Sequence, residues 1–206
     1  MMNYFITGIG TNVGKTVVSA ILTECLNADY WKPIQSGVLE GKDSDTVKSL
    51  ITNTQSAFHP ETYLLKEPLS PHFAAKLDGI HIELKKIQLP ETKNHLIIEG
   101  AGGLLVPINE SNYVIDIAQQ FDCEIVLVIS SYLGCINHSL LSIDYLKRNH
   151  FKLKALIFNG EFEPEVKQAI THTVQNTLII DIPTLSTLHK SQILEISQII
   201  RAQNAL

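Results

Sequence analysis

The chain has 206 residues, of which 45% are hydrophobic and 18% are charged, and its formal net charge is −5. This hydrophobic fraction and this modest net charge exclude an intrinsically disordered chain. The acidic balance excludes a general electrostatic attraction to nucleic acid or to an anionic membrane, and the length predicts one domain over residues 1–206.

The three cysteines, Cys25, Cys123 and Cys135, are far apart and form no CxxC pair. This spacing argues against a zinc site or a disulfide framework, and reduced thiols are typical of cytosolic proteins. The N-terminal residues lack the basic segment and long apolar run of a secretory signal. Apolar runs such as 125–129 fall far short of the roughly 20 residues that a membrane span needs. We therefore expect a cytoplasmic protein.

Short apolar segments alternate along the chain with longer amphipathic ones. Strands are predicted over residues 4–7, 30–32, 95–99, 124–129, 154–158 and 177–181. Helices are predicted over residues 15–27, 44–52, 112–121, 137–149, 163–174 and 191–204. Residues 56–78 are expected to be mostly loop with one short helix. Because uninterrupted apolar strands are typical of burial on both faces, this order predicts an α/β fold with a mostly parallel central sheet.

Residues 8–16 read GIGTNVGKT and lie between the first predicted strand and the first predicted helix. In that context the glycines let backbone N–H groups turn toward phosphate oxygens, and the helix N-terminus adds partial positive charge. Lys15 can reach the β- and γ-phosphates, and the hydroxyl of Thr16 suits Mg²⁺. Ile9 stands where the strict pattern GxxxxGK[ST] has Gly, so the loop is a variant. The pattern predicts a P-loop NTPase-like three-layer sandwich.

Charged residues follow two other predicted strands. Glu99 ends the strand 95–99 and is followed by the glycine-rich turn 100–103, so it can hold Mg²⁺ beside Thr16 or be a solvated turn residue. Lys32 follows the second strand, where it can point at the γ-phosphate or at an acidic substrate, or be an ordinary surface lysine. Asp45 lies near a helix start, where the helix dipole alone favours an acid.

A glycine turn also follows the strand 124–129. Its residues 133–138 read LGCINH, and free N–H groups at the start of the next helix can bind an anion. The alternative is an ordinary glycine turn with an Asn cap. His138 and His72 each lack a placed partner and are interpreted as structural. Tyr30 and Trp31 are interpreted as core residues.

Taken together, these segments resemble the dethiobiotin synthetase family, whose members close a ring at the expense of ATP in biotin synthesis. The matching pieces, in chain order, are TGIGTNVGKT, KPIQSG, the SD of SDT, EPLSPH, EGAGGLLVPI, LGCINHS and the strand end at Asn159. They run from residue 7 to about 160, and IPTL at 182–185 extends the resemblance.

The resemblance implies a reaction in three steps. Carbon dioxide adds to one amine of 7,8-diaminopelargonate and gives a carbamate. A carbamate oxygen attacks the γ-phosphate of ATP and gives a carbamic–phosphoric anhydride. The second amine then attacks the carbonyl, which closes the ureido ring of dethiobiotin and expels phosphate. Such a phosphoryl transfer needs positioning and charge neutralisation more than covalent help.

The resemblance also implies the residues of each site. The residues implied in catalysis are Lys32, Lys15 and Thr11, and those implied at Mg²⁺ are Thr16, Asp45 and Glu99. The residues implied at ATP are Asn12, Val13, Gly14, Lys15, Thr16, Val17, Asp45, Glu99, Gly100, Ala101, Gly102, Asn159, Gly160, Pro183, Thr184 and Leu185, with Asn159 at the adenine edge. The residues implied at the substrate are Ser36, Gly134, Cys135, Ile136 and Asn137. In the family that last turn comes from the neighbouring subunit, so a homodimer is implied.

The chain departs from the family pattern at three places. Gly10 and Asn12 stand where the family loop often carries acids. A late tyrosine that can bind the substrate carboxylate has no counterpart, since the last tyrosine is Tyr145. Weaker binding of the diamine is the consequence we expect.

Two other classes of P-loop protein are alternatives. A partition-type or membrane-cycling ATPase carries a signature lysine five residues before the P-loop lysine, where this chain has Gly10. A ligase related to the cobyrinic acid amidating enzymes needs an extra glutamine-hydrolysing domain, for which 206 residues leave no room. A structural or interaction module is the third alternative, and the intact GKT with two acidic strand ends argues against it.

Overall fold

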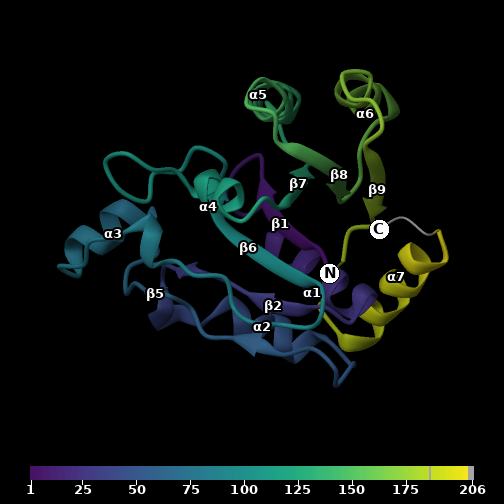
Figure 1. Ribbon diagram of the computed structural model, residues 1–206. Helices are drawn as coiled ribbons and strands as arrows, with labels where there is room; N and C mark the ends of the chain where they lie inside the picture. The colour runs from purple at the N-terminus through teal and green to yellow at the C-terminus, as the bar shows by residue number, and fades with distance from the viewer. Residues whose placement is uncertain (186, 204–206) are drawn as a thin grey trace.

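The computed structural model describes residues 1–185 and 187–203. Its centre is a parallel sheet of seven strands in the order β4-β2-β6-β1-β7-β8-β9, shown in Figure 1. These strands are β1 (Asn3–Gly8), β2 (Asp29–Trp31), β4 (Phe58–His59), β6 (Leu96–Gly103), β7 (Glu124–Ser130), β8 (Lys152–Asn159) and β9 (Leu178–Ile182). The predicted α/β class with a P-loop NTPase-like parallel sheet is confirmed.

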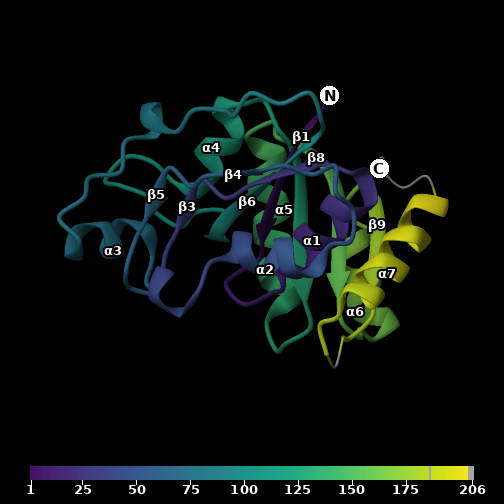
Figure 2. The same cartoon turned by 90° about the horizontal axis from the view of Figure 1, so that it is seen from below.

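Helices cover both faces of the sheet and make the outer two layers. Figure 1 shows α4 (Val114–Gln120), α5 (Cys135–Arg148) and α6 (Pro164–Thr171) on one face. Figure 2 shows α1 (Lys15–Leu26), α2 (Asp43–Leu50) and α7 (Lys190–Ala202) in front of the other face. Because both faces are covered, the central strands contain uninterrupted apolar runs.

The register of the central strands explains how the apolar runs form the core. Phe5 of β1 lies beside Ile98 of β6 and Ile125 of β7, and all three side chains are fully buried. Tyr30 and Trp31 are also buried, as predicted for core residues. All six strand pairs of this sheet are parallel, so their carboxyl ends meet at one edge, where ligands bind in open α/β sheets.

Three short strands lie in segments for which the sequence predicted only loop or turn. β4 adds to the edge of the sheet beside β2, while β3 (Ile34–Gln35) and β5 (Tyr63–Leu64) pair separately. Each has two residues, which is too short for an apolar period to appear in the sequence. The short helix predicted within 56–78 is α3 (Pro71–Leu77).

Most predicted boundaries differ from the structure by one or two residues, and the ends of β6 and α6 differ by more. β6 does not end at Glu99: it continues through the glycines to Gly103, which lies beside Gly8 after a register irregularity. The helix predicted over 163–174 ends at Thr171. The last helix ends at Ala202, and position 204 of its predicted span lies outside the described residues.

Two further observations concern the cysteines and the length of the helices. The three cysteines are free and buried: Cys25, Cys123 and Cys135. Within residues 1–185 and 187–203, no helix is both long and apolar enough to cross a membrane.

Candidate active site

The phosphate-binding loop lies between β1 and α1, and two of its glycines, Gly8 and Gly14, are packed too closely for any other residue. A Cβ on Gly8 would lie 2.4 Å from Cγ2 of Val13. A Cβ on Gly14 would lie 2.1 Å from Nδ2 of Asn159, and Gly14 has a φ of 94°. Asn12 also has a positive φ, of 60°, a conformation that Asn tolerates better than most residues. The loop conformation is therefore fixed by its own sequence.

Asn159 supports this loop from the end of β8. Its Nδ2 donates a hydrogen bond of 3.0 Å to the carbonyl oxygen of Val13. The two residues are 146 positions apart, so this bond is visible only in the fold. The sequence interpretation placed Asn159 at the adenine edge. In the structure the same side chain also holds the phosphate loop in shape.

Lys15 is the first residue of α1 and is 8% exposed. Its Nζ donates a hydrogen bond of 3.3 Å to the carbonyl oxygen of Gly10, which folds the side chain back along the loop. Burial lowers the pKa of Lys15 and nearby Lys32 acts in the same direction, while the carboxylate of Glu99 opposes them, and together they bring the pKa to about 8. A buried ammonium with no carboxylate at hydrogen-bond distance is suited to receive an anion.

Glu99 connects three elements at the sheet edge. Its Oε1 accepts hydrogen bonds of 3.0 Å from Oγ1 of Thr16 and 3.0 Å from Nζ of Lys32. Its Oε2 accepts a bond of 2.9 Å from the hydroxyl of Tyr30. Glu99 is 1% exposed, which contradicts the alternative of a solvated turn residue. Tyr30, taken from the sequence as core alone, thus also orients this carboxylate.

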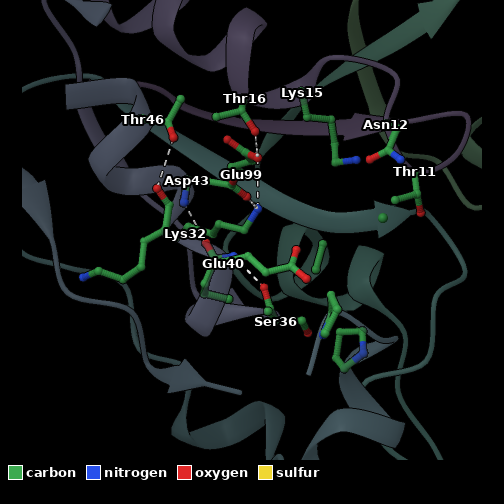
Figure 3. Close-up of a pocket in the computed structure, with 18 of the residues that line it drawn as sticks. Thr11, Asn12, Lys15, Thr16, Lys32, Ser36, Glu40, Asp43, Thr46 and Glu99 are labelled. Atoms are coloured by element: carbon green, nitrogen blue, oxygen red, sulfur yellow. Dashed lines mark hydrogen bonds and ion pairs between the residues drawn. The ribbon is translucent and has the colours of Figure 1, made fainter. Parts of the chain in front are cut away.

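Lys32 is buried and bonded to two carboxylates, those of Asp43 and Glu99. Burial alone would lower the pKa of Lys32, but these two carboxylates outweigh it and raise the pKa. The ammonium therefore stays charged, and the alternative of an ordinary surface lysine is contradicted. Figure 3 shows Lys32 and Glu99 meeting in the wall of the cavity.

The structure places Asp43, and not Asp45, in this cluster. Asp43 lines the cavity and bonds Lys32, whereas Asp45 is exposed and does not line it. Successive helix residues are rotated by about 100°, so positions 43 and 45 point in nearly opposite directions. Thr46, one turn further on, shares the side of Asp43 and lines the cavity with it (Figure 3).

These groups surround an open cavity of about 840 Å³ at the carboxyl edge of the sheet. The sequence-predicted residues that line it are Thr11, Asn12, Gly14, Lys15, Thr16, Val17, Lys32, Ser36, Glu99, Ala101 and Gly102. Val13 and Gly100 lie behind the wall, and a Cβ on Gly100 would be 3.0 Å from the ring of Phe5. Residues to which the sequence assigned no role complete the lining, among them Glu40, Asp43 and Thr46, together with Gln35 of the piece KPIQSG and 68–71 of the piece EPLSPH.

The residues expected beside the nucleotide base lie around a separate cavity. Asn159, Gly160, Thr184 and Leu185 line it together with Val17, which also belongs to the main cavity. Pro183 lines the neighbouring hollows instead. Gly160 is held by a hydrogen bond of 2.8 Å from its N–H to the carbonyl oxygen of Ile182. The two cavities thus adjoin at the start of α1.

The turn at residues 134–137, which is expected to bind the substrate carboxylate, lines neither of these cavities of its own chain. Gly134 has a φ of 105° and precedes α5, which begins at Cys135. None of Gly134, Cys135, Ile136 and Asn137 lines the main cavity. His138 is bonded through Nδ1 to the hydroxyl of Tyr132 at 2.7 Å, which agrees with its structural interpretation. His72, in α3, does not line the main cavity either.

The oxygen donors at the cavity fit a magnesium ion. Thr16 supplies a hydroxyl, and Glu99 and Asp43 supply carboxylates, which are hard ligands of the kind Mg²⁺ takes. In the described part of the chain no group of three or more His, Cys, Asp or Glu residues forms a closed metal site. That arrangement suits Mg²⁺, which usually keeps several waters and is bound by one or two carboxylates together with substrate phosphates.

Comparison with known proteins gives one consistent group of sequence relatives. A family model described as an AAA domain matches residues 2–192. The ATP-dependent dethiobiotin synthetase of Cytophaga hutchinsonii is 51% identical over 181 residues, 87% of this chain and 87% of the relative. The protein of the same name from Christiangramia forsetii is 51% identical over 82% of this chain and 81% of its own. That from Lawsonia intracellularis is 45% identical over 92% of each chain.

Solved structures similar to this one are more distant in sequence. The ParA family ATPase of Chlorobium tepidum has a TM-score of 0.57 at 10% identity, covering 98% of this chain and 92% of its own. The septum site-determining protein MinD of Pyrococcus horikoshii, complexed with Mg-ADP, has a TM-score of 0.54 at 14% identity, covering 98% of each chain. At such identities the likeness is one of fold alone.

Proposed function

We propose the reaction of this chain from its family, since the chain belongs to the ATP-dependent dethiobiotin synthetases. The reaction is the carboxylation and ring closure of 7,8-diaminopelargonate with CO₂, which consumes ATP and yields dethiobiotin, ADP and phosphate. One observation carries the proposal: Lys15, Lys32, Thr16 and Glu99 converge in a single cavity beside a phosphate-binding loop. Residues 1–206 are proposed to form one domain of this kind.

The phosphate loop binds the triphosphate. Backbone N–H groups at the start of α1 point into the cavity, and the helix N-terminus adds partial positive charge. Lys15 adds positive charge, because a pKa of about 8 leaves most of its ammonium protonated at neutral pH and the phosphates favour the charged form further. The base is proposed to lie in the adjoining cavity at Asn159, Gly160, Thr184 and Leu185, with Pro183 beside them.

Lys32, Thr11 and Ser36 surround the reacting end of the diamine. Lys32 is held in place by Asp43 and Glu99, so its ammonium is preorganised toward the carbamate and the γ-phosphate. Thr11 and Ser36 line the same cavity and donate hydrogen bonds to substrate or phosphate oxygens. Charge neutralisation by fixed lysines is the main requirement of phosphoryl transfer.

Thr16, Glu99 and Asp43 would hold Mg²⁺ beside the phosphates. When bound, the ion neutralises charge on the phosphate oxygens. The family resemblance points to Asp45 as the helix-start ligand, whereas the geometry favours Asp43 because that carboxylate lines the cavity. Tyr30 keeps Glu99 turned toward the cavity through its hydroxyl.

A homodimer would complete the substrate site. The turn at Gly134, Cys135, Ile136 and Asn137 is proposed to bind the substrate carboxylate of the neighbouring subunit through backbone N–H groups. The support is that the turn begins α5 with its residues exposed, apart from Cys135 and Ile136, and stands outside the main cavity of its own chain. Three buried free thiols support the cytoplasm as the location.

The test is phosphate release from ATP by the purified chain with Mg²⁺ and bicarbonate, with and without 7,8-diaminopelargonate. We expect release that depends on the diamine, together with a cyclic urea product identified by its mass. Slow ATP hydrolysis at a rate that does not depend on the diamine would contradict the proposal and favour a nucleotide-switch ATPase. The likeness to ParA and MinD does not favour that alternative, because it is one of fold and position 10 is Gly.

A further inference from the structure

The charges that line the main cavity are unevenly paired. Lys15 and Lys32 make one side positive, and Asp43 and Glu99 are both bonded to Lys32. Lys42 also lines the cavity, and its ammonium is paired with the carboxylate of Glu61 at 3.5 Å. Glu40 is the remaining carboxylate of the lining, and in the described part of the chain no cation lies within ion-pair distance of it. Figure 3 shows Glu40 close to Ser36, with its side chain directed into the open part of the cavity.

The backbone holds Glu40 at this position. It ends a 3-10 turn, Val38–Glu40, that lies between Gly37 with a φ of 72° and Gly41 with a φ of 122°. The N–H of Gly37 donates to the carbonyl oxygen of Glu67 at 2.9 Å, and that of Val38 donates to the carbonyl oxygen of Leu65 at 3.0 Å. A Cβ on Gly37 would lie 3.0 Å from Cβ of Pro68. The turn is therefore fixed against the 65–68 segment, and Glu40 is presented to the cavity by a built scaffold.

The charge of the substrate matches this arrangement. Primary alkyl amines are protonated at neutral pH, like the lysine side chain with its ordinary pKa of about 10.4. The negative groups of the reaction, carbamate and phosphate, belong beside Lys15 and Lys32. An ammonium beside those lysines would be repelled, since like charges a few ångströms apart in a partly buried site raise the free energy. The free carboxylate of Glu40 is the group in the lining that can receive it.

From this geometry we infer that Glu40 binds the ammonium group of the diamine that does not carry the carbamate. The inference rests on the proposed function and adds a specificity-determining residue to it. Glu40 holds this ammonium apart from the lysines in the bound diamine, and it thereby distinguishes a diamine from a monoamine. The ammonium loses its proton to solvent in the open cavity before its nitrogen attacks the carbonyl. The role of Glu40 is binding and orientation, and no proton transfer is assigned to it.

The test compares Glu40→Gln with Glu67→Gln as the matched control. Glu67 is an exposed carboxylate on the neighbouring segment and does not line the cavity. We expect the KM for 7,8-diaminopelargonate to rise about tenfold in Glu40→Gln, as for loss of one charge-assisted hydrogen bond. The KM for ATP and kcat are expected to change less than threefold, and Glu67→Gln to behave as the parent chain. Glu40→Asp, which keeps the charge on a shorter stem, is expected to lie between.

Calorimetric binding without ATP gives a second readout that is independent of turnover. The parent chain is expected to bind the diamine more tightly than a monoamine analogue, and Glu40→Gln to lose most of that preference. Three results for Glu40→Gln would each overturn the inference. They are an unchanged KM for the diamine, an equal rise in the KM for ATP, and a retained preference for the diamine over the monoamine analogue. If the parent chain itself makes no dethiobiotin, the proposed function fails instead, so the two failures are distinguishable.

Discussion

At the scale of single residues, Lys15 is the group whose charge is most directly tied to ATP. Its ammonium is buried and donates a hydrogen bond to the carbonyl oxygen of Gly10. Lys15→Ala is expected to lower kcat for phosphate release about 100- to 1000-fold, because a preorganised charge at the phosphates is lost. The measurement is diamine-dependent phosphate release at saturating ATP.

The matched control for Lys15→Ala is Lys93→Ala, which removes an exposed lysine from a distant loop. It is expected to keep the full rate. A thermal unfolding curve for both variants separates loss of charge from loss of folding. A Lys15→Ala enzyme that is folded and retains the full rate would contradict the assignment of residues 8–16 as a phosphate-binding loop.

The two acids at the start of α2 allow a sharper test of the magnesium site. Asp43 bonds Lys32 at the cavity, and Asp45 points to solvent. Asp43→Asn is expected to lower kcat/KM about 10- to 100-fold and to raise the Mg²⁺ concentration needed for half-maximal rate. Asp45→Asn is expected to stay within threefold. The reverse ranking would mean that Asp45 supplies the ligand and that Asp43 serves only to hold Lys32.

At the scale of elements, Glu24 of α1 holds the end of α2 in place. It is 4% exposed and accepts hydrogen bonds from the N–H groups of Thr52 and Asn53 at 2.6 and 3.0 Å, and from Oγ1 of Thr52 at 2.7 Å. Burial alone would raise the pKa of Glu24, but these hydrogen bonds outweigh it and lower the pKa. α2 carries Asp43, so this contact also supports the active site.

Glu24→Gln is expected to lower the free energy of unfolding at pH 7 by about 1–3 kcal/mol, since the variant leaves buried donors without an acceptor. A lowered native pKa gives stability that is present above the unfolded-state value of about 4.3 and is lost as pH falls below it. The difference between parent and variant in urea titrations should therefore stay constant from pH 7 to about pH 5 and shrink as the pH falls below about 4.3. Exposed Glu91→Gln is the control. A difference independent of pH would contradict the stated role of the carboxylate.

How much of the site could be predicted from the sequence depends on the kind of element that carries each residue. The four residues that converge are Lys15, Thr16, Lys32 and Glu99. They follow parallel strands or lie in the middle of one, and the carboxyl ends of these strands share one edge. Apolar runs and a glycine-rich loop are enough to predict that convergence. Whether Asp43 or Asp45 faces the cavity depends on the rotation of α2 about its axis. The sequence does not specify the first residue of that helix to within one position, so it could not distinguish the two acids.

Other features were not predictable because their causes are contacts distant in the chain. Glu40 reaches the cavity through a 3-10 turn held by Leu65 and Glu67, and no local pattern marks that turn. The bond from Asn159 to the loop spans 146 residues. The strands β3, β4 and β5 have two residues each, so they depend on their partners in the sheet rather than on apolar periodicity.

At the scale of the whole molecule, the cavity of one chain lacks the turn that would bind the substrate carboxylate. Leu133 and Leu141, on that turn and on α5, are large apolar residues that are strongly exposed. Exposed apolar residues at this turn are what a shared interface would require. In a homodimer, each site would then combine the phosphate loop of one subunit with the turn of its partner.

Mixing two inactive variants tests this arrangement. Lys15→Ala removes the phosphate-side charge, and Asn137→Asp places a carboxylate in the exposed turn, where it repels the substrate carboxylate with little change of shape. Each variant alone is expected to be nearly inactive. In a heterodimer one site carries both defects and the other carries neither. Random pairing makes about half of the dimers heterodimers, so co-expression should restore roughly a quarter of the parent activity.

The recovered activity separates the two architectures. If each site were built within one chain, every site in the mixture would carry one defect and no activity would return. Two affinity tags, one on each variant, allow the heterodimer to be purified, and that fraction should have about half the parent rate, since one of its two sites is intact. A purified heterodimer with no recovered activity would place the substrate carboxylate within a single chain and leave the turn before α5 with a structural role only.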